Sequence, residues 1–289
     1  MSTLQPQQRS YLLSIPPEIR SQIYTYLLTS PLPLKGPNTR KYTGEKYDIH
    51  TSILRTSQQL HAEARHVFFG RNTFHITSLP HQNPSPETDD DDQGSGAFEP
   101  PLQLKDLPLV RSLQLDLVYW PRRLRTHTGS DGLGWRPLSI GAERYVSSLS
   151  FVLGAVKESL VRLKFVGDVR PYMYQDVAMG EVDGKDAADE DEGLDVKKML
   201  TGFHVADTNA RFRSALGEVK VAEVGMRCEF LDSYFEFGVE KDVVLRSGLV
   251  YLIGQVLIAR SEARMNAVLR ELEDKEEVAA GCDGERRGI

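Results

Sequence analysis

The stretch "LLSIPPEIRSQIYTYLLTS", residues 12–30, decides how the N-terminal part of the chain folds. Pro16 and Pro17 suit the first turn of a helix, where backbone N–H groups have no partner within the helix. Glu18 follows at the end of the helix dipole that favours negative charge. An apolar residue recurs at every fourth position, which places one apolar face along the helix: Ile15, Ile19, Ile23 and Leu27. Tyr24 and Leu28 widen that face, and the stretch predicts an amphipathic helix over residues 11–28.

A second helix is predicted over "SILRTSQQLHAEARHVFF", residues 52–69, from its own apolar stripe. Ser52 or Thr51 is suited to cap its start, and Gly70 fits its C-terminal stop. The following "NTFHI", residues 72–76, has the composition of a short strand. Two helices and a strand therefore open the fold.

Several segments are too polar, or too rich in proline and glycine, to bury much apolar area. We expect a Pro/Gly-rich loop between the two helices and an acidic, proline-rich linker that contains the Asp89–Asp92 run. A second acidic insertion is expected to be disordered. The polar lead, this loop, the linker, the insertion and the C-terminal tail cover residues 1–10, 29–48, 78–100, 179–195 and 279–289.

The second half of the chain alternates predicted strands and helices. Its leucine-rich phrases "LVRSLQL" and "SLVRLKF" echo each other, about fifty residues apart. This irregular period indicates either a leucine-rich-repeat-like domain or an open α/β sheet over residues 101–278. The predicted elements are strands at 107–117, 161–168 and 218–230, helices at 145–160 and 202–216, and one long helix or two at 248–278. The fold class expected for the whole chain is α+β.

Composition narrows the classes of function. The 289 residues carry a net charge of −6, which disfavours strong attraction to nucleic acid or to anionic membranes. The polar start has no secretory signal, and the longest apolar run, residues 249–259, is too short to cross a bilayer. Cys228 and Cys282 lie far apart and belong to no metal-ligand pattern, as in a reducing compartment. We expect an intracellular protein, cytoplasmic or nuclear, that is not bound to membrane.

Two linked motifs resemble the F-box-like proteins that are abundant in filamentous fungi. The first motif lies in "LLSIPPEIRSQIYTYLL" and the second in "ILRTSQQLHAEARHVFFGRNTFHI". The resemblance covers residues 11–76 and implies a helical F-box-like module over residues 11–77. The matching positions are Leu12, Ile15, Pro16, Glu18, Ile19, Arg20, Ile23, Tyr24, Leu54, Ser57, Leu60, Glu63, Ala64, Phe68, Phe69, Gly70, Asn72 and Phe74.

The resemblance implies a non-enzymatic adaptor that docks the Skp adaptor of a cullin–RING (SCF-type) ubiquitin ligase, with residues 101–278 recruiting a protein substrate. A rigid proline turn beside an apolar stripe lowers the ordering cost of such binding. The candidate partner-binding residues are Leu12, Ile15, Pro16, Ile19, Ile23 and Leu27. The alternative is a structural interaction module, in which this stripe packs only on the second helix as half of a fused core.

Residues 119–137, "YWPRRLRTHTGSDGLGWRP", form the candidate substrate surface, because arginines and aromatics together bind carboxylates, phosphates or single strands. The residues concerned are Trp120, Arg122, Arg123, Arg125, Trp135 and Arg136. Two alternatives are that these arginines cover apolar surface or pair with the acidic insertions; nucleic acid is disfavoured. The sequence has no P-loop, no GxGxxG after a strand and no HExxH. We therefore expect no catalytic residues, no cofactor and no metal.

Overall fold

A computed structural model describes residues 11–78, 97–119, 136–168, 199–230 and 234–284. The chain divides into two compact units, Met1–Arg246 and Ser247–Ile289. The first unit holds all the strands, and the second holds one long helix.

Helices open the first unit, but both expected helices are interrupted. The helix expected over 11–28 breaks at Ile15–Pro16, since α2 can start only where the prolines end the preceding turn. The helix expected over 52–69 is a 3₁₀ turn followed by α4, whose cap is Ser57; its Oγ accepts a hydrogen bond from Leu60 N at 3.2 Å. The elements are α1 (Tyr11–Ser14), α2 (Pro17–Leu28), α3 (Pro37–Thr43) within the expected loop, η1 (Thr51–Arg55) and α4 (Gln58–Arg71).

One six-stranded sheet forms the centre of the first unit, in the order β2-β1-β3-β4-β5-β6. The four inner strands are parallel, and the two outer strands pair antiparallel with their neighbours. A 3₁₀ turn, η2 (Leu107–Leu109), precedes β3. The strands are β1 (Thr73–Ser78), β2 (Phe98–Glu99), β3 (Ser112–Asp116), β4 (Arg162–Asp168), β5 (Glu223–Glu229) and β6 (Tyr234–Glu240).

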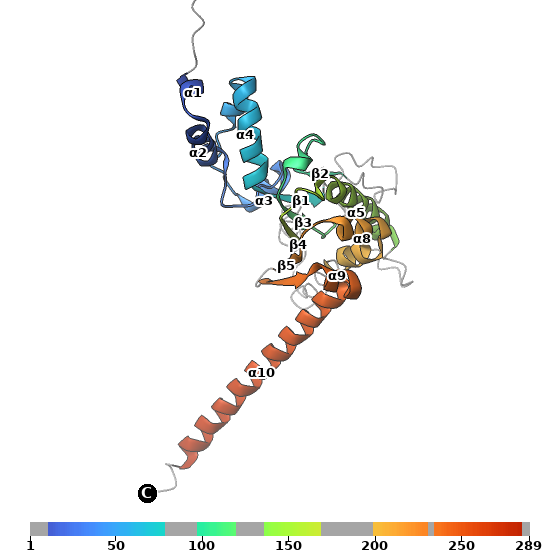
Figure 1. Ribbon diagram of the computed structural model, residues 1–289. Coiled ribbons are helices and arrows are strands. Elements are labelled where there is room, and N and C mark those ends of the chain that lie inside the picture. The colour runs from blue at the N-terminus through green and yellow to red at the C-terminus, as the bar shows by residue number, and fades with distance from the viewer. Residues whose placement is uncertain (1–10, 79–96, 120–135, 169–198, 231–233, 285–289) are drawn as a thin grey trace, which may run out of the picture. The chain divides into compact units, whose positions relative to one another are not determined.

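The chain order of the parallel strands equals their order across the sheet, and α-helices lie in the links from β3 to β4 and from β4 to β5 (Figure 1). Helix α5 (Arg136–Val156) lies between β3 and β4; a helix at 199–208 and α8 (Ala210–Glu218) lie between β4 and β5. The helix expected over 202–216 is split because Asn209 caps α8, accepting from Phe212 N at 3.0 Å. Helix α9 (Lys241–Ser247) follows β6, and sequence reasoning predicted neither element.

The two faces of the sheet differ in polarity. On one face, buried apolar residues stand in register on neighbouring strands, and α5 and α8 pack together over them. The ring of Phe165 on β4 lies 5.8 Å from that of Phe212 on α8. On the other face, Lys164 Nζ pairs with Glu236 Oε1 at 2.6 Å. The in-register apolar residues are Leu113, Leu115, Leu163, Phe165, Val224 and Met226.

Mixed helix and sheet confirm the expected α+β class. In the second unit, the segment expected as one helix or two is the single helix α10 (Leu249–Gly284). Gly248 precedes it with φ 85°, a left-handed conformation that glycine adopts without steric cost. Among the described residues, no single helix is both long and apolar enough to cross a membrane.

Deletion of residues 1–77 tests whether the N-terminal helices are separable from the sheet. The deletion removes β1, which pairs with both β2 and β3, so two neighbours lose their backbone partners. We expect the remaining chain to lack a cooperative thermal transition by circular dichroism, whereas deletion of residues 1–10 should leave one. A remainder that unfolds cooperatively near the full chain's midpoint would contradict this expectation.

Candidate partner-binding site

A partly buried ion pair fixes α2 against α4. The Arg20 guanidinium reaches the Glu63 carboxylate with two parallel hydrogen bonds, Nε to Oε2 at 2.9 Å and Nη2 to Oε1 at 2.7 Å. The Tyr24 hydroxyl donates to Glu63 Oε2 at 2.9 Å, so two side chains of α2 meet at one carboxylate of α4. Two-pronged arginine–carboxylate pairs fix geometry as well as adding energy. The pair therefore sets how α2 is turned about its axis.

The same arginine also holds the turn before α2. Its Nη1 donates to the Ile15 backbone oxygen at 2.6 Å, at the break between α1 and α2. Ile19 N and Arg20 N both donate to the Pro16 oxygen at 3.1 Å, which closes the first turn of α2. The proline turn and the helix that follows it are consequently one rigid piece.

These contacts hold the pKa of Glu63 low, at about 2 rather than 4.5. The hydrogen bond from Arg20 is the largest cause, followed by the bond from Gln59; both favour the charged carboxylate. Burial beside the Glu63 carboxylate raises the pKa of the Tyr24 hydroxyl. The cluster is therefore built around a carboxylate that stays ionised at neutral pH.

A second anchor, Asn72, joins the helices to the sheet. Its Nδ2 donates to the oxygens of Leu28 at 2.7 Å and Phe68 at 2.8 Å, which end α2 and lie in the last turn of α4. Its Oδ1 accepts from Ser30 N at 2.8 Å. Asn72 is fully buried and stands directly before β1, so one side chain ties both helix ends to the first parallel strand.

The anchored helix buries a different stripe from the one that sequence reasoning selected. Arg20, Tyr24 and Leu28 face α4, where Leu60 and Ala64 complete a buried cluster. The predicted apolar face is divided: Tyr24 and Leu28, which were expected to widen it, are buried, whereas Ile19 is exposed. Arg20 was not expected on the inner side, because an arginine gives no apolar signal.

The six candidate partner-binding residues fall into two groups. Leu12 and Leu27 are half-buried and pack against the cluster between α2 and α4. Pro16 is exposed, Ile15 and Ile23 are half-buried, and Ile19 is 45% exposed. Ile19 and Ile23 thus form an outer apolar stripe on the side of α2 away from α4.

Sequence reasoning missed one residue of this outer stripe. Tyr26 is 85% exposed and follows Ile19 by seven positions, which returns it to the same side of a helix. The i, i+4, i+7 spacing was available as a signal. Ile19, Ile23 and Tyr26, called the outer stripe below, give α2 an apolar surface that the described part of the chain leaves accessible.

The candidate substrate surface cannot be placed. Trp120, Arg122, Arg123, Arg125 and Trp135 lie outside the described residues, and Arg136 begins α5 without a described side chain. The Asp89–Asp92 run and the 179–195 insertion also lie outside them. The expectations for these segments stay predictions.

Buried acids and a thiol lie where the parallel strands end, and burial favours the protonated forms of Asp116 and Cys228. Asp116 is fully buried, and burial together with the nearby Asp168 carboxylate raises its pKa well above the usual range. Burial also raises the pKa of the Cys228 thiol to about 12, so it is protonated and a weak nucleophile at neutral pH. Across the described residues, no three His, Cys, Asp or Glu side chains are placed to hold a metal ion.

Comparison of the chain with models of protein families, with curated proteins and with solved structures finds no match.

Replacement of Glu63 by Gln tests the anchor through pH. Because folding lowers the pKa of Glu63 from 4.5 to about 2, its contribution is fully present above pH 4.5 and is lost as the pH falls towards 2. With Glu63 30% exposed and partly screened by water, we expect a loss on the order of 1–2 kcal/mol at pH 7. Denaturant unfolding of wild type and of Glu63→Gln from pH 7 to pH 2.5 measures this loss of stability.

Glu18→Gln, which removes an exposed carboxylate from the first turn of the same helix, is the matched control and should change stability less. The difference in the free energy of unfolding between wild type and Glu63→Gln should narrow below pH 4.5. A gap that stays constant across this range would show that the ionised Glu63 does not stabilise the fold.

Proposed function

We propose that this chain is a non-enzymatic protein-interaction adaptor that docks a partner through the outer stripe of α2. The observation that carries the proposal is the orientation of α2: the Arg20–Glu63 pair turns Tyr24 and Leu28 inward and leaves Ile19 and Tyr26 accessible. The partner implied by the F-box-like resemblance is the Skp adaptor of a cullin–RING ubiquitin ligase.

The two linked motifs contain residues of two kinds, which supports a docking role. A structural role within the chain accounts for three residues of the motifs, Arg20, Glu63 and Asn72, because their polar groups hold α2, α4 and β1 together. No such structural role accounts for Ile19, because it is 45% exposed and is not part of the buried cluster. Burying one such side chain under a partner contributes about 1.5–3 kcal/mol, a useful gain for a small interface.

Rigidity of the outer stripe also supports docking. A helix already fixed by hydrogen bonds at both ends loses little conformational freedom when a partner covers it. Arg20 fixes the N-terminal end of α2 through the Ile15 oxygen, and Asn72 fixes its C-terminal end through the Leu28 oxygen. The surface is preorganised for binding by a helix or turn of matching apolar character.

The proposal assigns substrate recruitment to the part of the chain after residue 101. Strands β1, β3, β4 and β5 follow one another across the sheet in chain order, with helices in two of the links. This arrangement supports a leucine-rich-repeat-like interpretation, in which successive strand–helix units stack side by side. The candidate substrate surface, residues 119–137, follows the third strand in the chain.

A second candidate function is a structural interaction module with no ligase partner. It is favoured by the continuity of the helices with the sheet: Asn72 alone separates α4 from β1, and Leu34 forms a parallel bridge with Phe74. In this candidate the helices of residues 11–77 are part of one core, and the outer stripe contacts another surface.

Co-expression with a fungal Skp adaptor, followed by size-exclusion chromatography, tests the proposal. We expect the full chain and the adaptor to elute as a stoichiometric complex. Ile19→Asp together with Ile23→Asp should abolish the complex, because two carboxylates would have to be desolvated in the interface. The variants alter the outer side of α2, so the circular dichroism of the chain should be preserved.

Leu104→Asp, which places the same charge on another exposed leucine, is the matched control and should leave the complex intact. Two folded proteins that elute separately would reject the ligase adaptor as the partner and leave the structural module. A complex that the double variant still forms would reject α2 as the docking surface.

A further inference from the structure

A groove with unpaired arginines runs beside the outer stripe. Its first part, about 400 Å³, lies along α2 from Ser21 to Thr29 and reaches Arg71 at the end of α4. Its second part, about 530 Å³, continues from the same Ser21 and Arg71 to Arg111 before β3 and Val161 before β4. The groove therefore joins α2 to the amino-terminal side of the parallel sheet.

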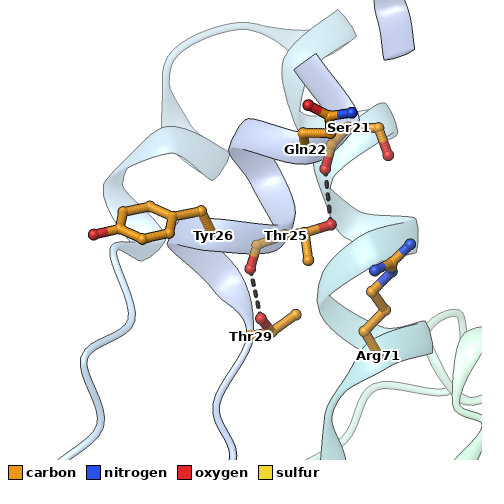
Figure 2. A pocket seen from close by; sticks show the side chains of 6 residues that line it. All are labelled: Ser21, Gln22, Thr25, Tyr26, Thr29 and Arg71. Carbon is orange, nitrogen blue, oxygen red and sulfur yellow. Dashed lines mark hydrogen bonds between the residues drawn. The ribbon is translucent and has the colours of Figure 1, made fainter. Parts of the chain in front are cut away.

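Two hydroxyls on the α2 wall of the groove, those of Thr25 and Thr29, are hydrogen-bonded to their own helix. Figure 2 shows Thr25 Oγ1 donating to the Ser21 oxygen at 2.8 Å and Thr29 Oγ1 donating to the Thr25 oxygen. Tyr26 and Val161, which stand at the two ends of the groove, are both mostly exposed. This wall and these ends offer a ligand apolar contact and few hydrogen bonds.

The charge of the groove is positive. Neither Arg71 nor Arg111 forms an ion pair with any described residue, and both are exposed. The acid among the residues that line the groove, Glu158, forms an exposed ion pair with Lys220. His66 also lines the second part. Two guanidinium groups free to make paired hydrogen bonds are suited to carboxylates.

We propose that this groove binds an acidic peptide segment of a partner protein, with carboxylates at Arg71 and Arg111 and an apolar side chain beside Tyr26. Charge complementarity selects this occupant, because the two arginines are the uncompensated charges of the groove. A protein with a net charge of −6 and only two such arginines lacks the extended basic surface that nucleic acid needs.

The groove shares Tyr26 with the outer stripe, but its two arginines lie apart from Ile19 and Ile23. At 100° per residue, Ser21 and Thr25 lie on a side of α2 separate from Ile19 and Ile23. Tyr26 stands at the border between the two sides. A partner seated on Ile19 and Ile23 would leave Arg71 and Arg111 accessible, so this inference does not rest on the proposed function.

Fluorescence anisotropy on the full chain tests the inference. The probe is a labelled twelve-residue peptide that alternates aspartate and glutamate with leucine and phenylalanine; the comparison peptide carries lysine at every acidic position. We expect the acidic peptide to bind and the lysine peptide not to. Arg111→Glu should weaken binding by about three- to tenfold, as expected for a partly exposed charge pair, and raised salt should weaken it further.

Arg71→Gln removes the second charge without placing an acid at the C-terminal end of α4, where the helix dipole would oppose it. Arg55→Glu, on an exposed arginine at the end of η1, is the matched control and should leave binding unchanged. If Arg111→Glu does not fold, Arg111→Gln replaces it.

The inference is overturned if both peptides bind equally, if Arg55→Glu weakens binding as much as Arg111→Glu, or if a single-stranded RNA oligomer displaces the acidic peptide. The Ile19→Asp and Ile23→Asp variant should still bind the acidic peptide. The peptide-binding assay can therefore reject the groove without rejecting ligase-adaptor docking, and the co-elution assay can reject docking without rejecting the groove.

Discussion

The pairing of Arg20 with Glu63 is the constraint on which the N-terminal part of this fold depends. An amphipathic helix can present any of several sides to its neighbour, and burial alone would have favoured the isoleucines of α2. The ion pair, together with the Tyr24 hydroxyl, turns the helix so that polar groups are satisfied between α2 and α4. Ile19 is consequently exposed and Ile23 half-buried, which is why α2 has an accessible apolar stripe.

Asn72 connects the oriented helices to the sheet. Because it bonds the ends of both helices and directly precedes β1, the orientation of α2 is fixed relative to the first parallel strand. The groove beside α2 ends at the starts of β3 and β4, so it exists only when helices and sheet are joined. A free-standing helical pair would have the outer stripe but not the second half of the groove.

The sequence predicted much of the element order, and the errors have identifiable physical causes. The strand at 162–168 was located almost to the residue, because its alternating apolar pattern ends in glycine and aspartate. The inner side of α2 was predicted in part: Tyr24 and Leu28 were assigned to the apolar face, whereas Arg20 was missed because it is buried through an ion pair that no hydropathy pattern marks. The split at Asn209 was overlooked, because a capping side chain inside an apolar pattern looks like a tolerated helix residue.

The outer stripe was predicted in part. Ile19 and Ile23 were chosen for their spacing; Ile19 is exposed and Ile23 half-buried outside the cluster, whereas Leu12 and Leu27 pack against it. Which apolar residues belong to the core depended on one long-range pair, Arg20 with Glu63, separated by 43 positions. No local pattern in the sequence specifies that partner, although the resemblance included both residues.

Hydrogen exchange of the full chain, alone and with a Skp-type adaptor, tests the central claim most directly. The account predicts that amides of α2 are protected in the free chain, since the helix is preformed, and that the adaptor adds protection around residues 15–27. Fast exchange of α2 in the free chain would contradict the preformed surface. Unchanged exchange on addition of an adaptor that binds the chain would contradict docking through α2.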